Sequence, residues 1–373
     1  MTSPFNQPIH VTKTTLPPLA EYTNQLADVW ANNWVTNNGP KTKELSRRLE
    51  DYLGVPNCAV VNNGTIALQI AIRALGLSGS VITTPFSYVA TTNALLWEGI
   101  DPIFTDIEPE TFTLDPTLVE AAIRPDTTGI LATHVYGYPC QHSALQDIAD
   151  RHGLKLIYDA AHAFGIEVEG ESILQWGDAS TLSFHATKVF HTIEGGGIVT
   201  ADAATTLTVD RMRAFGHVGR DYYEMGINGK NCEFHSAMGL LNLDLFEAKV
   251  AARRRISERY AELLAEAEVR VLTPTDYDGL TYNYGYLPTI FDNYEARERV
   301  VSYLNDHNVF PRRYFEPSLN SLPFLADDLR VACPVSERAA RTVLCLPLYP
   351  DLPLDHVTRI ADLVVTALKT TGV

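Results

Sequence analysis

Cysteine is scarce in this sequence and follows no disulfide or metal-binding pattern. Five cysteines occur among 373 residues, an odd number, and no two of them form a C-x-x-C pair. A disulfide framework needs an even set, and a zinc knuckle needs closely spaced pairs. The sequence therefore favours reduced thiols that pack as small apolar side chains. They are Cys58, Cys140, Cys232, Cys333 and Cys345.

Basic residues are also in deficit. Lys and Arg number 29 against 45 Asp and Glu, which gives a formal net charge of −16. Because nucleic acids are bound by basic surfaces, this balance argues against nucleic acid as a partner. An anionic small ligand is compatible with it, since a local pocket can be positive on an acidic protein. No metal site is expected, because no H-E-x-x-H spacing occurs among His134, His185, His191, His217 and His235.

Long apolar runs are absent as well. The first residues, MTSPFNQPIHVTKTTLPP, lack the basic-then-apolar order of a signal peptide. No apolar run reaches the ~20 residues that a membrane helix needs. We therefore expect no membrane partner and a cytoplasmic location.

Residues 58 to 200 alternate apolar β-type runs with helical patterns. This βαβ rhythm is typical of an α/β fold, in which helices cover both faces of a parallel sheet. The pattern predicts helices at 65–75, 89–98 and 143–152. It predicts strands at 59–62, 81–84, 103–106, 129–135, 154–159, 181–185 and 197–200.

The pattern changes in the last third, which alternates as an α+β unit. It predicts helices at 233–263, 296–305 and 355–368, and strands at 282–290 and 344–347. Tyr282, Tyr284 and Tyr286 alternate along one of these strands, and we expect them to pack there. A domain boundary near residue 246 would give a large domain of residues 1–245 and a smaller one of residues 246–373.

A glycine turn follows the first predicted strand. Asn63, Gly64 and Thr65 join it to a helix, and a glycine there lets the backbone approach a ligand closely. The N–H groups of a helix start suit a phosphate, and Thr65 adds a hydroxyl donor. Taken alone, the turn is more typical of a plain helix cap.

Asp159 ends an apolar strand in the segment LKLIYDAAHAFG. Open α/β sheets bind ligands at the carboxyl ends of their strands. A carboxylate there can pair with a protonated ring nitrogen, as pyridoxal phosphate (PLP) requires. It can equally cap a helix, and the residue alone does not separate the two.

Lys188 follows a further strand in the segment SFHATK, shortly before EGGG. Small and hydroxylated neighbours are an unusual setting for a solvated charge. Desolvation lowers the pKa of a lysine amine and frees it for Schiff-base chemistry, and Ser183 can bind phosphate. The alternative is an exposed loop lysine. A phosphate turn, a strand-end carboxylate and this lysine in one sheet together favour a PLP site.

Nine segments in order resemble the DegT/DnrJ/EryC1 family of sugar-nucleotide aminotransferases. The resemblance covers nearly the whole chain from Asn37-Asn38-Gly39-Pro40 onward, and implies the PLP fold-type I architecture. That architecture has a large domain, whose mostly parallel sheet is flanked by helices, and a smaller C-terminal α+β domain. The segments are NNGTIAL, TPFSYVATTNAL, DIEPETFTLDP, THVYGYPC, YDAAHAFG, SFHATKVFHTIEGGG, GINGKNCEFHSAMG, PRRYFEPSL and VSERAARTVLCLPLYPDL.

The resemblance also implies roles for single residues. Lys188 matches the Schiff-base lysine, Asp159 the partner of the pyridine nitrogen, and Tyr88 an aromatic residue that stacks on the cofactor ring. Asn228 matches an asparagine that reaches the phosphate from the neighbouring subunit, which implies a homodimer with shared active sites. The phosphate-binding groups of the family match Gly64, Thr65 and Ser183.

Other matches are less direct. His162 stands where the family often has Gln, and Asn63 where it often has Ser, so both positions keep a hydrogen-bonding side chain. We expect His162 to bind the cofactor, with a tautomer that its surroundings must select. The residues expected near the sugar-nucleotide substrate are His185, Arg313 and Tyr314.

The implied reaction moves an amino group from L-glutamate to a nucleotide-linked keto-6-deoxyhexose, with dTDP-4-keto-6-deoxyglucose at C-4 as the best match. Lys188 would act as its general base. Such enzymes make deoxyamino sugars for O-antigens, glycans or antibiotics. A C-3 enzyme of the family and a non-catalytic PLP-binding protein are alternatives. A sugar dehydratase would have histidine in place of Lys188, and a nicotinamide enzyme would carry its glycine fingerprint in the first βαβ unit.

Overall fold

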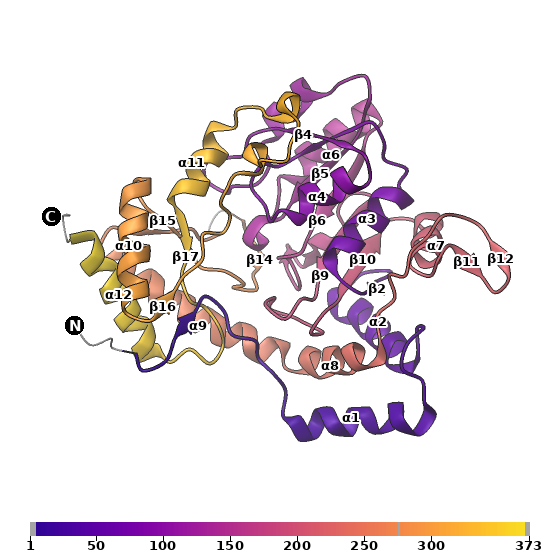
Figure 1. Cartoon of the computed structure of the whole chain (residues 1–373), viewed down its shortest axis with the longest axis horizontal. Coiled ribbons are helices and arrows are strands. Elements are labelled where there is room, and N and C mark those ends of the chain that lie inside the picture. The colour runs from indigo at the N-terminus through magenta and orange to yellow at the C-terminus, as the bar shows by residue number, and fades with distance from the viewer. Residues whose placement is uncertain (1–4, 275–276, 370–373) are drawn as a thin grey trace.

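A seven-stranded sheet lies at the centre of the chain (Figure 1). The computed structural model describes residues 5–274 and 277–369. The strand order is β2-β10-β9-β6-β5-β3-β4, and only β10 runs antiparallel to its neighbours. The expected mostly parallel α/β sheet is therefore confirmed. Its strands are β2 (Ala59–Val61), β3 (Ser80–Thr83), β4 (Asp101–Phe104), β5 (Thr127–Thr133), β6 (Lys155–Asp159), β9 (Ala179–Ser183) and β10 (Gly196–Thr200).

Helices cover both faces of this sheet because its strands are apolar on both faces. Val81 and Ile157 pack against α3 (Gly64–Ala74), α4 (Ala90–Trp97) and α7 (Ala203–Met212). Ile82 and Leu156, their chain neighbours, face the opposite side and pack against α6 (His142–His152). On that side the sheet edge is covered by α2 (Pro40–Leu53) and α8 (Glu233–Asp244). Within the described residues, no helix combines the length and apolar character that a bilayer span requires.

The C-terminal part of the chain builds a second core. Its helices are α9 (Phe246–Ala265), α10 (Tyr294–Asp306), α11 (Pro334–Thr342) and α12 (Leu354–Lys369). The same part of the chain forms a small sheet of β13 (Arg270–Val271), β15 (Pro288–Ile290) and β17 (Val343–Cys345). The helices α9, α10 and α12 share a core with Leu344 of β17, whereas α11 packs with Val343 and Cys345. Phe5 and Ile9 from the N-terminal segment join this core, and β1 (Ile9–His10) pairs with β16 (Val309–Phe310). The boundary near residue 246 stays a prediction.

Short elements complete the structure. The helix α1 (Leu19–Asn32) contacts α8, and the hairpin of β11 (His217–Val218) and β12 (Asp221–Tyr222) projects to the right in Figure 1. The remaining strands are β7 (Glu167–Val168), β8 (Glu171–Ser172) and β14 (Leu280–Thr281). Two helices of four residues or fewer, α5 (Pro116–Val119) and a 3₁₀ turn (Glu120–Ala122), follow β4. The other 3₁₀ turns are Val135–Gly137, Ile173–Gln175, Leu319–Ser321 and Asp327–Leu329.

Two sequence predictions are wrong in detail. The single helix predicted at 233–263 is interrupted at Leu245, because α8 packs on the sheet side with α2 whereas α9 packs on the C-terminal core. The strand predicted at 282–290 is reduced to β15. The Asn283 amide donates to the carbonyls of His162 (2.9 Å) and Phe164 (3.0 Å), and Tyr284 has φ of 51°, so this stretch leaves the sheet.

A buried carboxylate fixes the start of α2. Glu233, 1% exposed, accepts hydrogen bonds from the amides of Lys41 (2.7 Å) and Thr42 (3.1 Å) and from the Thr42 hydroxyl (2.7 Å). A Cβ on Gly39 would lie 2.6 Å from the Glu233 carboxyl carbon, so this approach requires glycine. The Gly39-Pro40 turn therefore ties α2 to α8 through an acceptor at the positive end of the helix dipole.

We expect Glu233→Ala to lower the free energy of unfolding by about 3 kcal/mol, because the buried donors of Lys41 and Thr42 would then have no acceptor. Urea unfolding followed by circular dichroism measures this loss. Glu44→Ala removes an exposed glutamate of α2, the helix whose start Glu233 binds, and serves as the control; it should change stability by less than about 0.5 kcal/mol. Equal effects of the two substitutions would contradict the capping role.

Candidate active site

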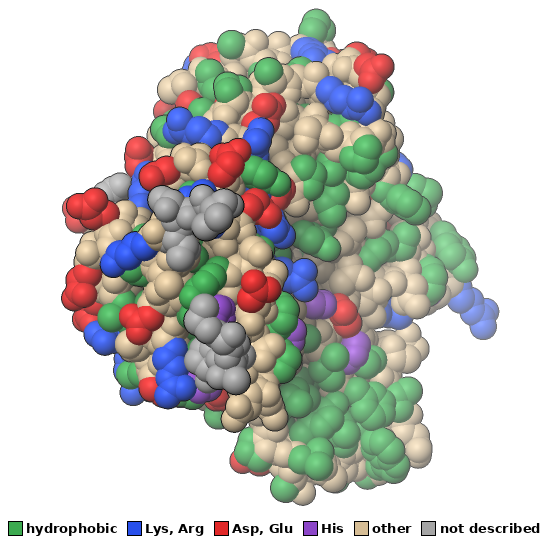
Figure 2. Space-filling model, turned by 60° about the vertical axis from the view of Figure 1, so that its left-hand side comes forward, with side chains coloured by type: hydrophobic (Ala, Val, Ile, Leu, Met, Phe, Trp, Pro, Cys, Tyr) green, Lys and Arg blue, Asp and Glu red, His purple; other side chains and the backbone are tan. Residues whose placement is uncertain are grey.

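A cavity of about 630 Å³ opens at the carboxyl ends of the central strands. Asp159 ends β6 and Ser183 ends β9, two parallel neighbours in the sheet, so their side chains reach the same edge. The first turn of α3 and the loop that carries Lys188 close the sides. Figure 2 shows the molecule hollowed near the centre of one face, where histidine, basic and acidic side chains lie among apolar ones.

One end of the cavity is built from the start of α3 and the end of β9. The Asn63 side chain caps the helix by accepting from the amide of Ile66 (2.8 Å). A Cβ on Gly64 would lie 2.9 Å from Cβ of Ser183, so only glycine allows the two segments this close. The first amides of α3 and the hydroxyls of Thr65 and Ser183 therefore face one space, which suits a phosphate.

Asp159 lies at the floor of the cavity and is buried. Its carboxylate accepts from the Thr91 hydroxyl (2.7 Å) and from the amide of Ala161 (3.1 Å). Burial raises the pKa of this carboxyl group, while these two hydrogen bonds and the charge of Lys188 oppose the rise. A carboxylate in this setting stabilises a cation placed against it.

Lys188 faces Asp159 across the cavity. Desolvation lowers the pKa of its amine to about 8, and the charge of Asp159 opposes that shift. The amine donates to the Tyr286 hydroxyl at 3.2 Å. A substantial fraction of the amine is therefore neutral near physiological pH and able to act as a nucleophile or base.

His162 is buried beside these two groups, and its tautomer follows from its contacts. Its Nδ1 accepts from the amide of Tyr136 (3.1 Å), so the ring proton resides on Nε2. Burial and the nearby charge of Lys188 hold the pKa of His162 well below its usual value. The ring stacks on Phe315 with an interplanar angle of 3°. His162 is thus a neutral donor at Nε2.

Most of the predicted site residues meet in this cavity. Its lining includes Gly64, Thr65, Tyr88, Asp159, His162, Ser183, His185, Lys188 and Tyr314. Asn228 and Arg313 do not line it. The Asn228 side chain instead accepts from Lys230 (2.8 Å), and the Arg313 guanidinium binds Glu298 (2.8 and 2.7 Å). Their predicted roles in binding phosphate and substrate stay predictions.

Several lining residues escaped the sequence analysis, and three of them contact the central groups of the site or their partners. Tyr286 was predicted to pack in a strand, but the structure places its hydroxyl against the Lys188 amine. Phe315 lies behind His162, and Ser87 shares a hydrogen bond with Thr91, the partner of Asp159 (2.7 Å).

Residues 19–365 match the model of the DegT/DnrJ/EryC1/StrS aminotransferase family. The chain belongs to this family. It is accordingly an aminotransferase, and the predicted family, enzyme class and fold-type I architecture are confirmed. Enzymes of this family depend on PLP.

Individual relatives agree with this assignment. The dTDP-4-amino-4,6-dideoxy-D-glucose transaminase of Escherichia coli is 38% identical over 95% of this chain and 97% of its own. DesI, solved in the presence of its TDP-sugar product, superposes with a TM-score of 0.93 at 34% identity, over 98% of this chain and 95% of its own. NtdA of Bacillus subtilis, solved with bound cofactor PMP, superposes with a TM-score of 0.85 at 27% identity, over 93% of this chain and 82% of its own.

The depressed pKa of Lys188 predicts a pH-dependent reactivity. In the cofactor-free protein the neutral amine increases as pH rises, so acylation of Lys188 should speed up with a midpoint near pH 8. Peptide mass spectrometry after short pulses of an acylating reagent measures this rate. Lys188→Arg is the control and should lose the labelled peptide. A rate that still climbs steeply above pH 10 would contradict the desolvated environment.

Proposed function

We propose that this chain transfers the amino group of L-glutamate to C-4 of dTDP-4-keto-6-deoxyglucose, with PLP bound covalently at Lys188. The observation that carries the proposal is one cavity in which a phosphate cradle, a buried carboxylate and a desolvated lysine face each other. The Escherichia coli relative supports the choice of C-4, because it is a transaminase of a 4-amino sugar. The TDP-sugar product in whose presence DesI was solved supports the nucleotide. We place the reaction in the cytoplasm.

The residues present fit PLP. The Gly64–Ser183 approach leaves room and donors for the phosphate, and Asp159 suits a protonated pyridine nitrogen. Tyr88 is 58% exposed at the cavity rim, so its ring is free to cover a planar ligand. His162 Nε2 supplies a neutral donor for a ring oxygen. When bound, PLP would supply the electron sink that stabilises a carbanion at the substrate carbon.

The protein groups move and hold the protons. Once the amino group of the donor has displaced it, the neutral Lys188 amine would take a proton from the α-carbon of glutamate, and the same amine would later return one to C-4 of the sugar. The Tyr286 hydroxyl holds the Lys188 nitrogen in position in both of its protonation states, because a phenol can accept or donate. Asp159 keeps a proton on the ring nitrogen, since a buried carboxylate needs a cationic partner.

A homodimer is part of this proposal. The segment next to Asn228 exposes several large apolar side chains, which a partner surface would cover. They are Phe215, Val218, Tyr222, Tyr223, Met225 and Ile227. A phosphate dianion binds several donors, and an Asn228 amide from the other subunit would add one to those of α3 and Ser183. Apolar side chains also gather on the lower part of Figure 2, where α1 lies.

The function is tested by incubating the protein with PLP, L-glutamate and dTDP-4-keto-6-deoxyglucose. We expect 2-oxoglutarate and an aminated sugar in equal amounts, with NMR placing nitrogen at C-4. Borohydride treatment of the loaded enzyme should place a pyridoxyl adduct on the Lys188 peptide. Lys188→Ala should lose both the product and the adduct.

Other outcomes separate the alternatives. Amination of a 3-keto sugar in preference to the 4-keto sugar would show a C-3 enzyme. A lysine adduct without 2-oxoglutarate, for every keto sugar supplied, would show a PLP-binding protein without this activity. An adduct on another lysine would overturn the assignment of Lys188.

The shared site is tested by mixing two inactive variants. Lys188→Ala chains and Asn228→Ala chains, once they exchange subunits, should form hybrid dimers with one intact site. Activity should then rise above that of either parent, towards half of a wild-type dimer per hybrid. Chains tagged for size confirm that exchange occurs. If hybrids form and remain inactive, each site lies within one chain.

A further inference from the structure

A second cavity adjoins the first. Its volume is about 830 Å³, and both cavities are lined by Ser87, Tyr88, Tyr314 and Phe315. The second cavity lies where the segment after β16 meets the loop before α4. A ligand whose reactive carbon reaches Lys188 in the first cavity can therefore extend past Tyr88 and Tyr314 into the second.

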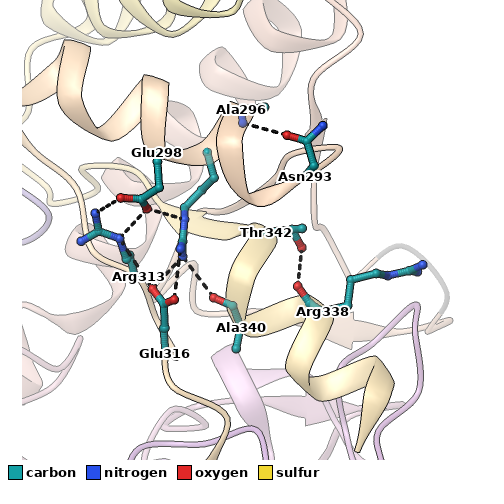
Figure 3. Close-up of polar contacts among 9 residues, drawn as sticks. Asn293, Ala296, Glu298, Arg313, Glu316, Arg338, Ala340 and Thr342 are labelled. Carbon is teal, nitrogen blue, oxygen red and sulfur yellow. Dashed lines mark hydrogen bonds and ion pairs between the residues drawn. The ribbon is translucent and has the colours of Figure 1, made fainter.

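Arg313, one of two arginines at this cavity, is held by acidic neighbours. Its guanidinium binds both carboxylate oxygens of Glu298 (2.8 and 2.7 Å) and lies 3.6 Å from Glu316 (Figure 3). The same two glutamates pair with Arg297, whose side chain is fully buried, at 2.8 and 3.0 Å. Two positive and two negative charges thus balance within this cluster, which anchors the segment in place.

Arg312, the other arginine, has no such partner. Its backbone is fixed by mutual hydrogen bonds with Cys345 (3.1 and 2.8 Å), while its side chain is exposed at the second cavity. In the part of the chain that the structure describes, its guanidinium makes no ion pair or hydrogen bond. Arg312 lines the second cavity together with Tyr88 and Tyr314, which also line the first cavity.

We propose that Arg312 binds the diphosphate of the nucleotide sugar in the second cavity, while Arg313 acts only through the cluster that positions this segment. The inference rests on the proposed function. An unpaired guanidinium offers the forked donors that phosphate oxygens accept. Because the chain has a net charge of −16, binding a dianion requires a local positive charge. Arg312 supplies this charge from a position that its backbone hydrogen bonds with Cys345 fix.

The test compares Arg312→Gln with Arg313→Gln in the PLP-loaded enzyme. Calorimetric titration with dTDP alone should show at least a tenfold loss of affinity for Arg312→Gln, about 1.4 kcal/mol. Arg312→Lys should lie between this variant and wild type, because it keeps the charge and loses the fork. Arg313→Gln should bind dTDP within about threefold of wild type and unfold at a lower temperature.

A second measurement separates the nucleotide from the amino donor. The half-reaction with L-glutamate, followed by cofactor absorbance in a single turnover, should be unchanged in Arg312→Gln. A slower glutamate half-reaction would assign Arg312 to the donor carboxylate and overturn the proposal. Normal dTDP binding by Arg312→Gln, or equal losses in both Gln variants, would also overturn it. Because dTDP binding needs no turnover, this result does not depend on which sugar carbon is aminated.

Discussion

The opposed charges of Asp159 and Lys188 share one poorly hydrated space, and the rest of the site is arranged around them. Burial pushes the carboxyl group towards its neutral form and the amine towards its own neutral form. Their mutual attraction pulls both back towards ionisation. The balance leaves an amine that titrates near physiological pH beside a carboxylate held by Thr91 and Ala161.

The fold produces this balance by simple means. Parallel strands end at one edge of the sheet, so Asp159 and Ser183 arrive together without any long-range loop. Residues from beyond the large sheet then close the space: Tyr286 holds the amine, and Phe315 stacks on His162. The pair is consequently desolvated by segments that are distant in the chain, which couples the chemistry of the lysine to the packing of the C-terminal part.

Much of this was predictable from the sequence, and the failures have identifiable causes. Strand ends and glycine turns are local signals, so Asp159, Lys188 and the Gly64 turn were found from short segments. Tyr286 was misassigned because alternating tyrosines fit a strand, and only the tertiary contacts of Asn283 remove them from it. The break at Leu245 was missed because the apolar spacing continues through it. The structure separates the two helices because α8 packs in one core and most of α9 packs in another. The helices α1, α2, α7 and α11 were not predicted. Polar residues dominate α2 and α11, so packing decides the form of these two helices.

The contact between Glu233 and the start of α2 also constrains how the chain is made. The amides of Lys41 and Thr42 donate to the Glu233 carboxylate, which is synthesised 192 and 191 residues after them. At a synthesis rate of about 5–20 residues per second, that delay is on the order of ten seconds or more on the ribosome. The strand β2 likewise has no neighbour until β10 emerges. The N-terminal quarter of the protein therefore cannot complete its structure as it leaves the ribosome, and it depends on the middle of the chain to finish.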